Sequence, residues 1–351
     1  MKKELLIASA LVSTVGAASV ANAVTSSTSG SHHTGLRGVN LDTGTTDTIS
    51  QVVQSSFSVS LSETTDGGVG IASSFMLANE GTSGTQSAGL TLTFTDGSKL
   101  DVINAGNAAK THDISVPGGA GEASITVTAN NRAQTGLDFF GEASVVGVEW
   151  HSAADFMADG LKVGASFSAD TGAAADASAA LESSWGVGAT YVTDAGDTAV
   201  TIGTGYADSE WKDSGTAPSS GSNGFHVGFS AVTGNLTVAV GYANGDKVSG
   251  GTAVSEYEVN DNTVTKVGAK YVSGDVTLSI GYSSGSGKDS TTLGTAGTKE
   301  DANDSTDAGI SYAVASGVTA NLGWKSVESQ EAAVSETSGG TSWYIGANMA
   351  F

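Results

Sequence analysis

The chain has 351 residues, of which 49 are Gly, 2 are Pro and none is Cys, and its formal net charge at pH 7 is −22. Because it has no thiol, disulfide bonds, thiolate metal sites and a lipidated cysteine anchor are excluded. The acidic excess disfavours nucleic acid as a partner and favours attraction of cations, although surface solvation alone also explains it, and Gly at about twice its ordinary frequency favours strands and turns.

Residues 1–23 have the pattern of a secretory signal peptide. Lys2 and Lys3 precede an apolar run over 5–18, and Ala-Asn-Ala at 21–23 is a small-x-small cleavage sequence. The mature chain is therefore expected to begin at Val24. No later stretch approaches the roughly 18 consecutive apolar residues of a membrane helix, so a mature chain that crosses a membrane must cross it with strands.

Residues 24–142 carry weaker strand signals than the rest of the chain. Their Ser/Gly-rich beginning, which includes His32 and His33, favours a flexible tail without a bound metal. Candidate strands follow at 55–62, 68–77, 88–95, 98–104 and 122–128. These candidates lack aromatic residues in regular rows, and the lengths of their connectors do not alternate cleanly.

Residues 143–351 repeat a unit of about ten residues with alternating apolar and small or polar side chains, followed by a connector. Eleven such units keep one apolar register, as in Leu236, Val238, Val240 and Tyr242, while the other register holds Gly, Ser, Thr, Asn, Lys and His. The alternation predicts an antiparallel sheet. It fits a barrel in lipid around a wet interior, and it also fits a soluble sandwich with an apolar core.

Connector lengths and aromatic positions favour the transmembrane barrel. Tight turns near 194–196, 233–234, 273–274 and 315–317 alternate with long polar stretches, which is typical of short periplasmic turns and long extracellular loops. Aromatic residues beside these connectors predict two belts at the membrane interfaces. The predicted belt residues are Trp150, Phe167, Trp185, Tyr191, Tyr206, Phe225, Tyr242, Tyr271, Tyr282, Tyr312, Trp324, Trp343 and Phe351.

The inward register of such a barrel contains charged residues that would line the pore. They are Glu149, His226, Lys266, Lys270 and Lys325. A solvated charge in the interior costs little, whereas a charge that faces lipid is destabilising. For Lys325, snorkelling of a long side chain at the rim is an equally good explanation.

The last strand, 341–351, ends on Phe351 and has apolar residues at every second position back to Trp343. With strand ends such as Gly205-Tyr206 and Gly323-Trp324, the chain resembles Gram-negative outer-membrane porins of the alphaproteobacterial general type. The resemblance implies sixteen strands, a homotrimer, contact with outer-membrane lipids, and recognition of the Phe351 strand by the barrel-assembly machinery. Five candidate strands and eleven regular ones also make sixteen; the alternative is a twelve-stranded barrel with a separate N-terminal region.

The resemblance further implies a loop that folds inward between strands five and six and narrows the pore. Residues 129–141 occupy this position and contain Arg132 and Asp138, with Glu142 directly after them. Opposed charges at a constriction set a transverse field that biases ion passage. An ordinary surface loop is the alternative for this segment.

The sequence therefore predicts an all-β outer-membrane channel for passive diffusion of small hydrophilic solutes and ions. The acidic loops predict a cation preference and loose binding of divalent cations at the outer mouth. No enzyme activity and no other cofactor are expected. The alternative is a surface adhesin or structural β-rich protein without channel activity.

Overall fold

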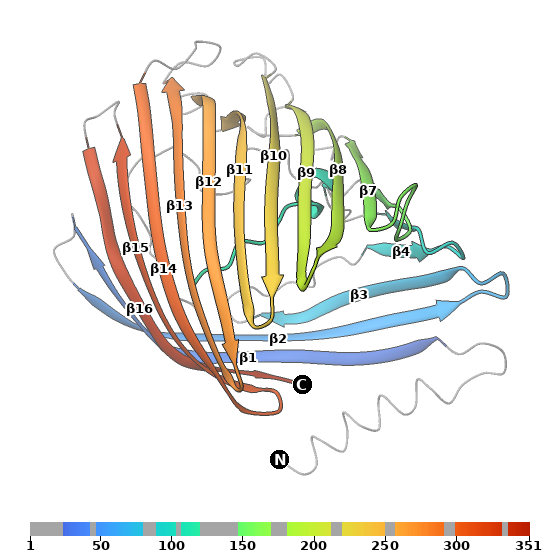
Figure 1. Cartoon of the computed structure of the whole chain (residues 1–351), viewed down its shortest axis with the longest axis horizontal. Helices are drawn as coiled ribbons and strands as arrows, with labels where there is room; N and C mark the ends of the chain where they lie inside the picture. The colour runs from blue at the N-terminus through green and yellow to red at the C-terminus, as the bar shows by residue number, and fades with distance from the viewer. Residues whose placement is uncertain are drawn as a thin grey trace.

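A computed structural model describes residues 24–42, 47–79, 89–102, 107–119, 147–169, 181–211, 220–249, 257–290, 299–331 and 336–351. In these residues sixteen antiparallel strands form one closed barrel (Figure 1). Each strand pairs with its neighbours along the chain, and β1 pairs with β16 to close the sheet. The predicted sixteen-stranded antiparallel barrel is confirmed. In the described part of the chain, no helix is long and apolar enough to span a membrane.

The strands β4, β5 and β6 have only 4 to 5 residues, whereas β1, β2 and the strands from β8 onward have 14 to 17, and among the described residues one short helix lies between β5 and β6. Their bounds are β1 Thr25–Leu41, β2 Thr48–Thr64, β3 Gly70–Asn79, β4 Leu90–Thr93, β5 Lys99–Val102, α2 Ala108–Thr111, β6 Gly147–His151, β7 Leu161–Ala169, β8 Leu181–Ala195, β9 Thr198–Trp211, β10 Ser220–Thr233, β11 Leu236–Ser249, β12 Tyr257–Ser273, β13 Val276–Ser290, β14 Lys299–Ala315, β15 Val318–Glu331 and β16 Glu336–Ala350.

The apolar register faces outward, and this distinguishes the barrel from a soluble sandwich. Val238, Leu278 and Ile280 lie on the outer face with 41%, 45% and 55% of their surface exposed. A sandwich would bury these side chains between two sheets. The opposite register points into the barrel, where Gly241 and Gly281 lie beneath residues of another chain segment.

Tight turns at one rim set the register of the long strands. Gly196, Gly234, Gly274 and Gly317 all have positive φ, between 55° and 76°, in the turns that join β8 to β9, β10 to β11, β12 to β13 and β14 to β15. Glycine adopts this left-handed conformation without a steric penalty. The ladders that begin at these turns keep the apolar side chains of adjacent strands in one row, as in Phe229 opposite Val240.

The structure corrects the prediction for the first strand. Residues 25–41, with His32 and His33, form β1, where the sequence favours a flexible tail. The outward register of β1 is mostly polar, with Ser26, Thr28, His32 and Thr34, so the apolar alternation that reveals the later strands is missing. Backbone pairing with β2 on one side and β16 on the other stabilises β1 as a strand although its own sequence has little strand pattern.

The remaining N-terminal candidates correspond to observed strands in four of five cases. The candidates at 55–62, 68–77, 88–95 and 98–104 overlap β2, β3, β4 and β5. The candidate at 122–128 and the expected signal peptide at 1–23 lie outside the described residues. Among the described residues, the sixteen strands of the barrel include β1, which the sequence did not predict.

A lysine placed on either face should distinguish lipid from water as the surroundings of that face. Val240 lies on the outer face between Phe229 and Val267, and Val240→Lys is expected to cost about 2–4 kcal/mol of stability in lipid vesicles. Ser230 lies on the inward register of the neighbouring strand, and Ser230→Lys is the matched control, with a much smaller expected loss. Urea unfolding in vesicles measures both. Equal losses in the two variants would contradict the assignment of faces.

Candidate functional site: the barrel interior

A segment between β5 and β6 folds into the barrel. Residues 107–119, here called the inward segment, begin with Asn107, whose side chain caps α2 by accepting a hydrogen bond from the backbone N–H of Ala109 at 3.0 Å. The N–H of Ala108 donates to Ser166 Oγ on β7 at 2.9 Å. Figure 1 shows this teal segment passing behind β9, β10 and β11. The interior of the barrel is therefore narrowed by the chain itself.

Glycines on the inner wall let the inward segment lie directly against the strands. A Cβ at position 205 would lie 2.6 Å from Ala109 Cα, and a Cβ at position 228 would lie 2.7 Å from Ile114 Cβ. Real Cβ atoms do not approach other atoms this closely. The glycines in such contact, here called the glycine track, are Gly164, Gly186, Gly188, Gly203, Gly205, Gly228, Gly268 and Gly281. The track follows the inward segment from β7 to β13.

Polar contacts fix the inward segment at several points along the wall. His226 Nε2 lies 2.6 Å from the carbonyl oxygen of Ala109, and since a carbonyl only accepts, this nitrogen carries the proton. His112 Nδ1 lies 2.7 Å from Thr190 Oγ1, and burial lowers the pKa of His112. At the far end, the N–H of Gly119 donates to the Asp307 carboxylate.

The structure places the five described pore-lining candidates on the inward register. Glu149 and His226 are 3% and 1% exposed, and both hold the inward segment. Lys266, Lys270 and Lys325 lie opposite Gly241, Ser279 and Asp307 on neighbouring strands.

The predicted constriction residues Arg132, Asp138 and Glu142 lie outside the described residues. The inward segment that the structure describes comes earlier in the chain, at 107–119. Sequence reasoning missed it, together with its anchors His112 and Asp307. The available signal was the recurrence of glycine on the polar register of consecutive strands.

The predicted belt residues lie on the outer register. Twelve of the thirteen are at least 37% exposed, and Trp150 is partly covered by Phe156 at a ring-centroid distance of 5.8 Å. On neighbouring strands the rings of Trp185 and Tyr206 lie against each other, with their centroids 5.4 Å apart. The hydroxyl of Tyr282 donates to Asp304 at 2.9 Å, so this ring has its polar end on the side of the long loops.

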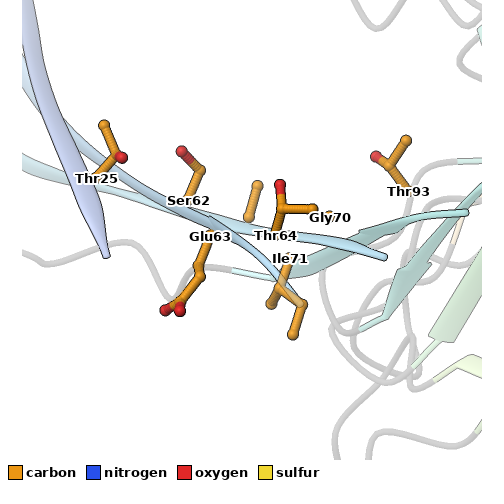
Figure 2. Close-up of a pocket in the computed structure, with 8 residues that line it drawn as sticks. Thr25, Ser62, Glu63, Thr64, Gly70, Ile71 and Thr93 are labelled. Atoms are coloured by element: carbon orange, nitrogen blue, oxygen red, sulfur yellow. The ribbon is translucent and has the colours of Figure 1, made fainter. Parts of the chain in front are cut away.

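The polar lining continues to the rim with the short turns. A shallow hollow of about 420 Å³ lies there at the ends of β1 to β4. Figure 2 shows Thr25, Ser62, Thr64 and Thr93 on one side of the strands, with Glu63 and Ile71 on the other side. The polar side chains of the inward register therefore extend as far as this opening of the barrel.

An apolar outer face, a polar inner face and a closed ladder define a membrane-spanning barrel channel. The chain matches the model of the Gram-negative porin family over residues 8–333. It belongs to that family, and its location is the outer membrane. The comparison with curated proteins finds no match.

Solved structures with the same fold are bacterial outer-membrane proteins. A loop-deletion mutant of OmpT, an outer membrane protein of Vibrio cholerae, is 17% identical with a TM-score of 0.62, and the match covers 93% of this chain and 99% of that one. The anion-selective porin from Comamonas acidovorans is 13% identical, with a TM-score of 0.66 and coverage of 93% and 100%. A trimer form of Vibrio cholerae OmpT is 16% identical, with a TM-score of 0.59 and coverage of 93% and 99%. At these identities the likeness shows the fold.

Substitutions in the glycine track should displace the inward segment. Gly205→Ala places a methyl group against Ala109, whereas Gly241→Ala meets only Val116 Cγ2 at 3.7 Å, an ordinary contact. We expect faster backbone hydrogen exchange over 107–119 in Gly205→Ala and unchanged exchange in Gly241→Ala. Mass spectrometry of the folded protein in detergent measures both. Unchanged protection in Gly205→Ala would contradict the role of the track.

Proposed function

We propose that this protein is a passive diffusion pore for small hydrophilic solutes and ions, without a catalysed step. The observation that carries the proposal is the polar inward register, crossed by a segment anchored to the wall at His226, Thr190 and Asp307. A fixed segment narrows the passage while hydroxyls, glycines and charged side chains keep it wet. Solute size is then limited by the space between the inward segment and the opposite wall.

We propose a modest cation preference for this pore. Acidic residues cluster in and beside the long connectors, for example Asp208, Glu210, Glu328 and Glu336, and they raise the local concentration of cations at the mouth. Lys266 and Lys270 on the inner wall of β12 act in the opposite direction. The anion-selective porin of Comamonas acidovorans has the same fold, so selectivity depends on these charges and not on the barrel.

We propose a homotrimer, with the outer face of β1 and β2 at the subunit contact. Ser26, Thr28, His32 and Thr34 make this part of the outer surface polar, which is unfavourable against hydrocarbon and suits contact with protein. Vibrio cholerae OmpT, which shares the fold, occurs in a trimer form. Outer-membrane lipids would then surround the apolar strands that follow.

Recordings in a planar bilayer test the pore directly. Under a KCl gradient we expect a reversal potential of the cation-selective sign. After a single insertion of the protein into the bilayer, we expect the conductance to fall in three equal closing steps. Lys266→Gln and Lys270→Gln should each shift the reversal potential further toward cation selectivity. An anion-selective potential in the unmodified protein would reject the preference, and the absence of any conductance would reject the pore.

The last residue of the chain pairs with β1 and leaves its side chain exposed. The backbone of Phe351 pairs with Gly30 through two hydrogen bonds, at 3.0 and 3.1 Å, and its side chain is 75% exposed. We propose that the barrel-assembly machinery binds this end before β1 closes on β16. Phe351→Ala should slow assembly in cells, measured as accumulation of the unfolded form, whose gel mobility does not change on heating. Assembly at the normal rate would contradict the proposal.

A further inference from the structure

Three potential metal ligands meet on the inner wall of β5 and β6. Asp101 and Glu149 lie directly opposite each other in the ladder, and His151 follows two residues after Glu149 on the same face. Each offers one ligand atom, and these atoms lie within 4.8 Å of one another. His151 Nε2 is 2.8 Å from Asp101 Oδ2 and 4.0 Å from Glu149 Oε2. The three side chains therefore converge on one point.

The carboxylates of Asp101 and Glu149 each accept a hydrogen bond from a threonine hydroxyl. Thr91 Oγ1 donates to Asp101 Oδ1, and Thr111 Oγ1 of the inward segment donates to Glu149 Oε1 at 2.5 Å. The second oxygen of each carboxylate is the one that faces His151. Hydrogen bonds of this kind orient metal ligands in proteins and fix their rotamers. The arrangement has both the ligands and the groups that position them.

The charge balance of the cluster favours a cation. Glu149 is 3% exposed, and its ion-pair contact with His151 is long, at 4.0 Å, which is beyond hydrogen-bond distance. A buried carboxylate without a close counter-charge is costly. Asp101 and His151 are 29% and 24% exposed, so an ion can reach the cluster from the interior of the barrel.

We propose that Asp101, Glu149 and His151 bind a divalent transition-metal ion, with Zn²⁺ as the best fit. One imidazole nitrogen and two carboxylate oxygens are ligands that Zn²⁺ takes, with a water molecule in the fourth position. Bond lengths of about 2.1 Å require ligand atoms roughly 3.4 Å apart in a tetrahedron. The observed separations of 2.8 and 4.0 Å lie on either side of this value, so small side-chain rotations form the site.

The proposed site connects the metal to the inward segment. Glu149 binds the metal through one oxygen and accepts the Thr111 hydrogen bond through the other. Metal binding thus immobilises Glu149 and, through Thr111, the start of the inward segment. The site differs from loose cation binding at the acidic loops because it requires an imidazole and lies inside the barrel.

Calorimetric titration with Zn²⁺ tests the site without depending on conductance. The folded protein in detergent is titrated in excess Ca²⁺, which occupies the acidic loops. We expect one Zn²⁺ per chain, and at least tenfold weaker binding in His151→Gln, Glu149→Gln and Asp101→Asn. Thr91→Val removes a supporting hydrogen bond and leaves the ligands, and it should weaken binding by about tenfold.

His33→Gln is the matched control, because His33 on the inner face of β1 is a rival imidazole away from the cluster. Heat-modifiable gel mobility establishes that each variant is folded before titration. Unchanged Zn²⁺ binding in this control supports the proposal. Any one of three results would overturn it: His151→Gln retains its affinity for Zn²⁺, His33→Gln loses Zn²⁺ binding, or the unmodified protein does not bind Zn²⁺.

Discussion

The structure depends on the closure of its backbone hydrogen-bond ladder. In hydrocarbon no water is available to satisfy N–H and C=O groups, and each unsatisfied group costs several kcal/mol. Pairing of β1 with β16 from Ser31 opposite Ala350 to Leu41 opposite Gly340 removes the two free edges of the sheet. Once the ladder is closed, the alternation of side chains gives every strand a lipid side and an inner side. The outer apolar register and the polar interior both follow from that closure.

Close packing inside the barrel turns a wide cylinder into a narrowed channel. The inward segment approaches the wall closely because glycine removes side chains from the inner register of β7 to β13. At opposite ends of the inward segment, His226 and Asp307 add directed hydrogen bonds to this packing. Adjacent residues of one strand thus serve the two faces, since Gly205 makes room for Ala109 on the inner face and Tyr206 lies on the outer face.

The fold was largely predictable from the sequence because lipid imposes a simple pattern. Alternation in the last eleven strands and the even spacing of tight turns define faces and rims without knowledge of distant contacts. β1 escaped prediction because its outward residues, such as Thr28 and His32, are polar. The alternation of apolar and polar side chains predicted that Lys266 and Lys270 point into the barrel, and the structure places both on the inner register.

The interior was less predictable because it depends on long-range contacts. No local period identifies Ile114 or Pro117 as residues that pack against Gly228 and Gly268. The cluster of Asp101, Glu149 and His151 exists only because β5 pairs with β6 across a long connection. Glycine recurs on the polar register of consecutive strands, but the sequence does not show which segment packs against these glycines, nor that β5 and β6 are neighbours.

The most direct test of the central claim is cysteine accessibility along β13 in lipid vesicles, for which a chain without native cysteine is well suited. Single cysteines at 277 and 279 should react with a charged, water-soluble thiol reagent, since Thr277 and Ser279 lie on the inward register. Cysteines at 278 and 280 should be protected, since Leu278 and Ile280 face lipid. Reaction at 278 and 280 with protection at 277 and 279 would contradict the account.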